Sequence, residues 1–158
     1  MVQRAQLLLE RLPLWLAALW WGSLSTIGFL VVPLLFVHLP TPALAGAMAA
    51  KLFTAQTWVS VLCGLLLLLV SRKNQTSGLA GQGQAAIIFI AGGMLLALLA
   101  EFAVAPRIMA RENLALWHRV GSGMYLLQWL CAGATFWKVA LPGRRAEVQS
   151  VADSADPM

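Results

Sequence analysis

The chain has 158 residues, of which 60% are hydrophobic and only 11% are charged. A soluble domain carries about 25% charged residues, so this composition excludes a water-soluble surface. The formal net charge is +5, but the basic residues gather near the ends of apolar stretches, where we expect them to meet lipid headgroups rather than nucleic acid.

The predicted elements, in chain order, are a short N-terminal segment, four long apolar stretches and a polar tail. Each stretch is long enough to cross a bilayer as a helix, which needs roughly 20 mostly apolar residues. The sequence therefore predicts an all-α integral membrane protein, a bundle of four transmembrane helices that fills residues 12–141. The predicted segments are 1–11 (cytoplasmic N-terminus), 12–39, 47–70, 85–105 and 114–141 (the four helices) and 142–158 (a disordered cytoplasmic tail).

Four spans place both chain ends on one side of the membrane. Basic residues favour the cytoplasmic side, and seven of them fall on the terminal side against four on the other. We therefore predict a multi-pass protein of the cell inner membrane with both termini in the cytoplasm.

A five-residue pattern, F-x-V-x-P, occurs in the first and third predicted spans, at Phe29–Pro33 and Phe102–Pro106. Proline lacks a backbone N–H and its ring crowds the preceding turn, so we expect each proline to kink or end its helix. The repetition is consistent with two related helical hairpins, and a match of five residues also arises by chance.

Glu101 is the sharpest candidate for chemistry, because it lies inside the third predicted span. An ionised carboxylate in a bilayer costs ~2.5–3.5 kcal/mol, so it must be paired, protonated or close to water. His118 is expected at a similar depth in the fourth span, where it would share a proton with Glu101 or help it hold a cation. Ser122 and Tyr125 follow on the same face at helical spacing and supply hydroxyls. The sequence predicts a polar site of these four residues in the outer half of the bundle.

His38 ends the first predicted span and, with His118, gives two imidazoles on one side of the membrane. Two histidines on separate helices are a candidate pair of haem or copper ligands, although no tight ligand spacing supports them. The chain contains no Ser-His-Asp arrangement, no HExxH motif and no phosphate-binding loop, so we expect no enzymatic activity.

Several short motifs, taken in order, resemble a known family. The first half reads WWGSLSTIGFLVVPLLF, followed by Ala45-Gly46 and Phe53, and the second half reads EFAVAPRIM, followed by LWHRVGSGMYLLQW. They resemble the uncharacterised four-helix membrane domain family that includes eukaryotic transmembrane protein 205. The resemblance covers about residues 14–137 and implies a multi-pass membrane protein of unknown molecular activity. Where that family is expected to carry asparagine-like residues, this chain has Glu101 and Tyr125.

A second, shorter likeness lies in the fourth span. The segment Trp117–Gly123 is similar to the His-Arg-x-Ser-Gly stretch of succinate dehydrogenase membrane anchors, which bind haem and quinone, but it has one extra residue before Ser122. On a helix this shift turns the serine by about 100°. The first resemblance is therefore the stronger of the two.

The sequence leaves the molecular role open between three alternatives. One is a small proton-coupled exporter that acts as a dimer around Glu101. Another is a haem-binding or copper-binding membrane module that uses His38 and His118. The third is a structural or partner-binding role in the lipid bilayer, with homo-oligomers formed through faces of small residues.

Overall fold

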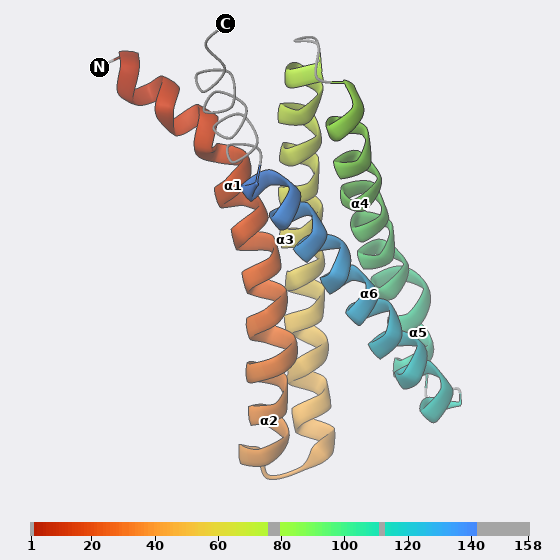
Figure 1. Cartoon of the computed structure of the whole chain (residues 1–158). Helices are drawn as coiled ribbons and strands as arrows, with labels where there is room; N and C mark the ends of the chain where they lie inside the picture. Colours follow the sequence, from red (N-terminus) through yellow and green to blue (C-terminus); the bar gives the residue numbers. More distant parts are fainter. Residues whose placement is uncertain (1, 76–79, 111–112, 142–158) are drawn as a thin grey trace, which may run out of the picture.

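A computed structural model of the whole chain describes residues 2–75, 80–110 and 113–141, and the side chains of 11–71, 86–110 and 113–141. Within these ranges every regular element is helical, and the helices form four long rods (Figure 1). The tail expected to be disordered, 142–158, lies outside the described residues. The elements are α1 (Val2–Thr26), η1 (Ile27–Val31) and α2 (Val32–His38), then α3 (Pro42–Gln75), then α4 (Ala80–Leu99), η2 (Ala100–Val104) and α5 (Ala105–Met109), and finally α6 (Leu114–Ala140).

Each of the four rods makes most of its contacts with two others. α1 contacts α3 and α6, and α4 contacts the same two helices. In Figure 1 the first rod descends and α3 rises beside it, whereas the third rod descends and α6 rises obliquely across the others. The N-terminal end of α1 and the C-terminal end of α6 therefore lie toward the same end of the molecule, as expected for an even number of long helices.

Three helical segments are long and apolar enough to cross a membrane: Arg11–His38, Pro42–Ser71 and Ala86–Met109. α6 is comparable in length, at 27 residues, but polar side chains lower its apolarity and it is not among the three. Large apolar side chains are exposed on all four rods, for example Val37, Leu69, Met109 and Leu127. An extended apolar exterior suits lipid and not water, and the fold is therefore that of a membrane protein.

The two prolines of the F-x-V-x-P patterns lie inside continuous rods and do not end them. A five-residue π-helical turn comes before each, η1 before Pro33 and η2 before Pro106. An α-helical turn would bring the proline ring against the carbonyl four residues back, and the wider π turn makes room for it. In both turns the residue before the proline donates its N–H five residues back, from Val32 to the Ile27 carbonyl and from Ala105 to the Ala100 carbonyl.

The second π turn changes the depth of Glu101. The predicted span ended at residue 105, which put Glu101 near one end of its helix. In the structure the rod continues through Pro106 to Met109. Glu101 consequently lies about one turn from the midpoint of the Ala86–Met109 segment, deeper than the sequence alone indicated.

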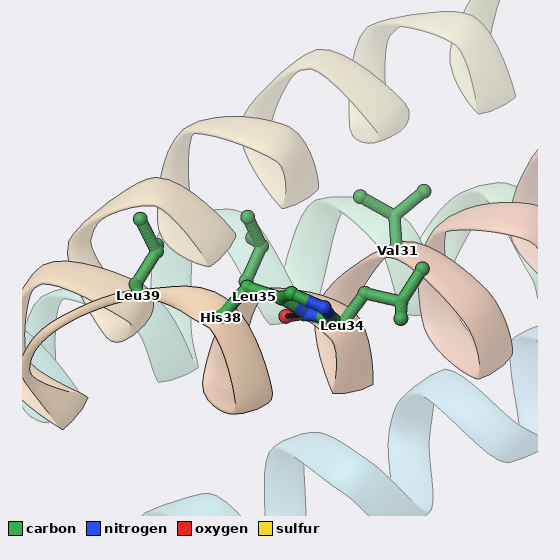
Figure 2. Close-up of a pocket in the computed structure, with 5 residues that line it drawn as sticks. All are labelled: Val31, Leu34, Leu35, His38 and Leu39. Atoms are coloured by element: carbon green, nitrogen blue, oxygen red, sulfur yellow. Dashed lines mark hydrogen bonds between the residues drawn. The ribbon is translucent and has the colours of Figure 1, made fainter.

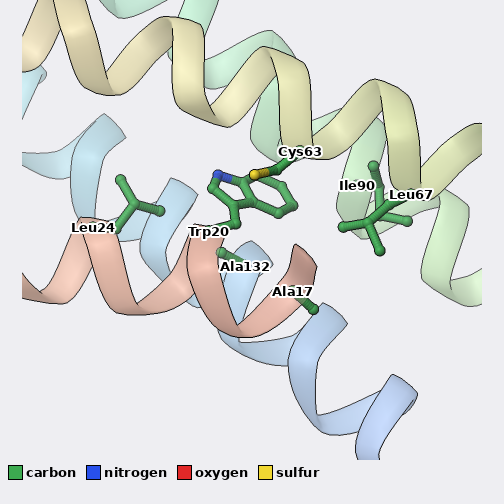
Figure 3. Close-up of a cluster of buried hydrophobic side chains, with 7 residues drawn as sticks. All are labelled: Ala17, Trp20, Leu24, Cys63, Leu67, Ile90 and Ala132. Carbon is green, nitrogen blue, oxygen red and sulfur yellow. The ribbon is translucent and has the colours of Figure 1, made fainter. Parts of the chain in front are cut away.

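The centre of the packing is a cluster that draws on all four rods, shown in Figure 3. Trp20 is its largest member and is 0% exposed. The tip of its ring packs over Gly93 of α4, where a Cβ atom would lie 2.8 Å from the nearest ring carbon. Position 93 therefore requires glycine, because the Trp20 ring approaches the backbone of α4 too closely for a larger side chain. The members of the cluster are Ala17, Trp20, Leu24, Cys63, Leu67, Ile90 and Ala132.

Two further glycine contacts relate the first half of the chain to the second. Trp21 and Met94 each lie eight residues before the phenylalanine of their F-x-V-x-P pattern. Trp21 packs on Gly133 of α6, and Met94 packs on Gly64 of α3. The halves thus share a π turn at the same place and a reciprocal contact of a large side chain on a glycine.

Candidate functional site

Glu101 lies in η2 and is held from the neighbouring helix. The hydroxyl of Thr54, on α3, donates to the Glu101 carboxylate with an Oγ1–Oε1 distance of 2.9 Å. Glu101 is part-buried and Thr54 is exposed, so their hydrogen bond lies at the surface of the bundle, and no ion pair to Glu101 occurs within the part of the chain that the structure describes. A single hydroxyl therefore accounts for the polar contacts of this carboxylate among the described side chains.

The π turn also exposes a main-chain acceptor on the same residue. In an α-helix the Glu101 carbonyl would accept from the N–H of Ala105, but that N–H is directed to Ala100. Pro106 follows and has no N–H to offer. The Glu101 carbonyl therefore accepts no hydrogen bond from Ala105 or from Pro106. Together with the carboxylate, it gives Glu101 two oxygen acceptors that could bind a hydrogen-bond donor or a cation.

Tyr125 contacts the other π turn and not Glu101. Its hydroxyl donates to the main-chain carbonyl of Leu24 at 2.8 Å. Its ring packs against Gly28 of η1 and, edge to face, against Phe53 with centroids 5.2 Å apart. The side chain that the sequence assigned to a site with Glu101 therefore ties α6 to the first rod, and it reaches α3 one residue away from Thr54.

His118 and Ser122 are both exposed on α6. No hydrogen bond or ion pair joins either of them to Glu101 among the described side chains. The inward contacts of this end of α6 are made by neighbouring residues: Trp117 lies under the guanidinium of Arg107, 4.5 Å from the ring centroid, and Gly121 faces Val104. The structure thus brings Glu101 together with Thr54, and it leaves the predicted four-residue site divided.

His38, the other candidate metal ligand, ends α2. Its Nδ1 lies 3.0 Å from the carbonyl of Leu34, one turn earlier. Figure 2 shows it among the residues that line a shallow, open and apolar groove, all of which come from this stretch of chain. The described side chains include no group of three or more His, Cys, Asp or Glu placed to hold a metal ion. The lining residues are Val31, Leu34, Leu35, His38 and Leu39.

A buried polar cluster, which the sequence analysis missed, joins three helices. We call Ser23, Gln56, Ser60 and Gln128 the midplane cluster, because each lies close to the middle of its helical segment. Gln56 and Gln128 are 2% and 3% exposed, and Ser60 is fully buried. The Gln56 amide nitrogen donates to Ser23 at 3.0 Å and to Ser60 at 3.4 Å, and the Gln128 amide nitrogen donates to Ser60 at 3.0 Å.

A signal for this cluster was available in the sequence. Gln56 and Gln128 are the only amide side chains within the four predicted spans. Polar side chains in the membrane interior are costly and usually face other helices, where they find partners. Two amides at the centres of two spans therefore indicate an interhelical hydrogen-bonded centre as clearly as Glu101 indicates a carboxylate site.

Comparison with known proteins gives one positive result. Among curated proteins and among solved structures, no match was found. A family model matches residues 15–115, from the first rod through η2 and α5 to the start of α6. This match includes Glu101, Thr54 and three of the four midplane residues. It covers well over half of the chain, which therefore belongs to the family described as Domain of unknown function (DUF4149).

Proposed function

We propose that this chain is a proton-coupled carrier of the cell inner membrane, in which Glu101 alternately holds a proton and a lipophilic cation. The observation that carries the proposal is a carboxylate inside a helix apolar enough to span a membrane, bonded to Thr54 of the neighbouring helix. The proposed layout is that of transmembrane-protein-205-like proteins, a four-helix bundle with both termini in the cytoplasm.

The energetics of the carboxylate support exchange. An ionised carboxylate within a bilayer costs ~2.5–3.5 kcal/mol on insertion scales. Interhelical hydrogen bonds in a membrane protein contribute ~0.6 kcal/mol on average, so the bond from Thr54 offsets a small part of this cost. In this proposal a bound cation offsets the remaining cost. Replacing a proton by the cation is the step that a coupled carrier needs.

The surroundings of Glu101 favour an organic cation. The flanking Leu99 and Phe102 are 43% and 64% exposed, so a ligand reaches the carboxylate across apolar surface. A small hydrated cation would have to give up its water there, whereas a cation with delocalised charge and apolar groups would not. The main-chain carbonyl of Glu101 supplies a second acceptor for it.

The working unit in this proposal is a homodimer. A single copy leaves Glu101 only part-buried beside the exposed ring of Phe102. A second copy packed on this face would enclose the two carboxylates between protomers and shield the bound cation from lipid. Charged groups in membrane spans usually face such a protein interior.

The first prediction tests this function in liposomes that carry the purified protein and a pH-sensitive dye inside, with tetraphenylphosphonium added outside. We expect the wild-type protein to exchange internal protons for tetraphenylphosphonium, and Glu101→Gln to abolish the exchange, because the amide cannot release a proton. Thr54→Val, which removes the hydroxyl that holds the carboxylate, should slow the exchange.

Thr57→Val is the matched control. The Thr57 hydroxyl bonds to the carbonyl of Phe53 within its own helix, so this variant should exchange protons at the wild-type rate. Equal exchange by wild type and Glu101→Gln would contradict the proposal, and so would a wild-type protein whose proton flux does not respond to tetraphenylphosphonium.

A further inference from the structure

The midplane cluster contains a buried amide oxygen whose role no other contact explains. Gln56 Oε1 has no hydrogen-bond partner among the described residues, although the side chain is 2% exposed. A buried acceptor without a donor is rare in proteins and calls for an explanation, such as a bound water or ion.

The surrounding bonds fix the orientation of this amide. Ser23 Oγ donates to the Trp20 carbonyl at 3.0 Å, and Ser60 Oγ donates to the Gln56 carbonyl at 2.9 Å. Each hydroxyl has one proton, and while that proton is directed to a main-chain carbonyl the serine can only accept from the Gln56 side chain. The group that faces them must therefore be the NH₂ group of the amide. If the amide were reversed, its oxygen would face the two serine oxygens. In the observed orientation the amide nitrogen bonds to both serines, and Oε1 is the atom without a partner among the described residues.

A buried donor without a partner among the described side chains occurs one helical turn away from Ser23 on α1. Trp20 Nε1 is buried and also has no partner among the described residues. Trp20 lies one helical turn before Ser23, whose Oγ accepts from Gln56. In Figure 3 the indole nitrogen of Trp20 lies on the side of the ring that is nearer to Leu24. The helices α1 and α3 run in opposite directions (Figure 1), so the later residues of α1 lie beside the earlier residues of α3. The nitrogen therefore lies toward the turns of α3 that precede Cys63.

Both side chains are held in place by other contacts. The ring of Trp20 is fixed at its far end by Gly93, where even a Cβ atom would lie within 2.8 Å. The amide of Gln56 is held by two serines from two helices. Trp21 Nε1 is a second buried donor without a partner, but it lies against Gly133 of α6.

We propose that the midplane cluster binds a single water molecule, which accepts from Trp20 Nε1 and donates to Gln56 Oε1. Water fits because the site offers one donor and one acceptor, and a buried water needs two to four polar partners. The cluster has no ionisable side chain, so an ion has nothing there to balance its charge. This site holds whether or not Glu101 carries protons, and it places a hydrated position at the centre of the helices.

The experiment is nuclear magnetic resonance on the wild-type protein in lipid nanodiscs, with the indole nitrogens labelled. We expect a cross-relaxation peak between the Trp20 indole proton and a bound water, distinguished by its sign from chemical exchange. The Trp129 indole donates to Ser25 Oγ at 2.8 Å, so it should show no such peak and serves as the internal control.

Gln56→Met tests whether the water is held as proposed, because methionine has a similar volume and no donor or acceptor of comparable strength. We expect this variant to lose the water peak at Trp20 and to keep the Trp129 resonance. A wild-type protein without a water peak at Trp20 would overturn the proposal. A direct coupling from the Trp20 indole to the Gln56 amide, or a water peak that persists in Gln56→Met, would do so as well. If Gln56→Met does not fold, the wild-type comparison of Trp20 with Trp129 decides.

Discussion

Trp20→Ala is expected to destabilise the folded protein by about 3–5 kcal/mol, the range found when a large aromatic side chain is removed from a packed core. Trp20 is 0% exposed and belongs to a cluster drawn from all four rods. Lipid gives helices no hydrophobic reason to associate, so close packing holds them together. The contacts that Trp20 makes would be lost outright, because a cavity in the middle of the four helices has no atoms to replace them.

The measurement is unfolding by sodium dodecyl sulfate in mixed micelles, followed by tryptophan fluorescence and circular dichroism. Trp15→Ala is the matched control, since Trp15 lies on the same helix and is 66% exposed. This variant should unfold at nearly the wild-type detergent fraction. Equal destabilisation by the two substitutions would show that Trp20 is not the centre of the packing.

Ser60→Ala should produce the second large effect on stability. The Ser60 hydroxyl accepts from the amides of Gln56 and Gln128 and donates to a main-chain carbonyl. Its removal loses three hydrogen bonds, of which the bond from Gln128 joins two helices and contributes about 0.6 kcal/mol at the average for interhelical bonds in a membrane protein. It also leaves two buried amide groups short of an acceptor, which costs more than the loss of exposed bonds.

A double-mutant cycle separates this hydrogen bonding from packing. Gln128→Leu removes one of the donors that Ser60 accepts, so the combined variant should cost less than the sum of the single substitutions. Ser122→Ala changes an exposed hydroxyl on α6 and should leave the free energy of unfolding almost unchanged. Additive effects of Ser60→Ala and Gln128→Leu would mean that the two side chains do not interact.

The helices themselves were largely predictable, because a long apolar stretch determines helix formation locally. The sequence indicated four such stretches, and the structure has four helical rods at those positions. Their ends differ because proline was expected to kink or end a helix, whereas a π turn before Pro106 lets the third rod continue to Met109. The π turn accommodates the proline ring without ending the helix, an outcome that the loss of one backbone N–H does not by itself indicate.

The candidate site was predicted only in part. Glu101 stood out because a carboxylate in an apolar stretch is unusual, but its partner, Thr54, lies 47 residues earlier on another helix. Helical spacing placed His118, Ser122 and Tyr125 on one face, and the structure buries only part of that face. Which part of α6 turns inward depends on the oblique angle at which it crosses the other rods (Figure 1). Residue spacing does not encode this angle.

The midplane cluster was likewise predictable only in part from the sequence. The rarity of amides within apolar stretches could be read from the sequence, and it identifies Gln56 and Gln128 as residues that need partners. Their actual partners, Ser23 and Ser60, follow from the way three helices meet at their midpoints. A sequence supplies the polar groups, and tertiary packing decides which of them meet.

The claim on which the account most depends is that all four rods, α6 included, lie in lipid. The direct test is spin labelling at Leu62 of α3 and Leu127 of α6, both more than half-exposed and within about one turn of the midpoints of their helices. The protein is reconstituted in nanodiscs with Cys63 and Cys131 replaced by alanine. Both labels should be accessible to oxygen and shielded from a water-soluble nickel chelate, whereas a label at Thr41, between α2 and α3, should show the reverse. A label at Leu127 that the nickel chelate reaches as readily as it reaches Thr41 would contradict the account.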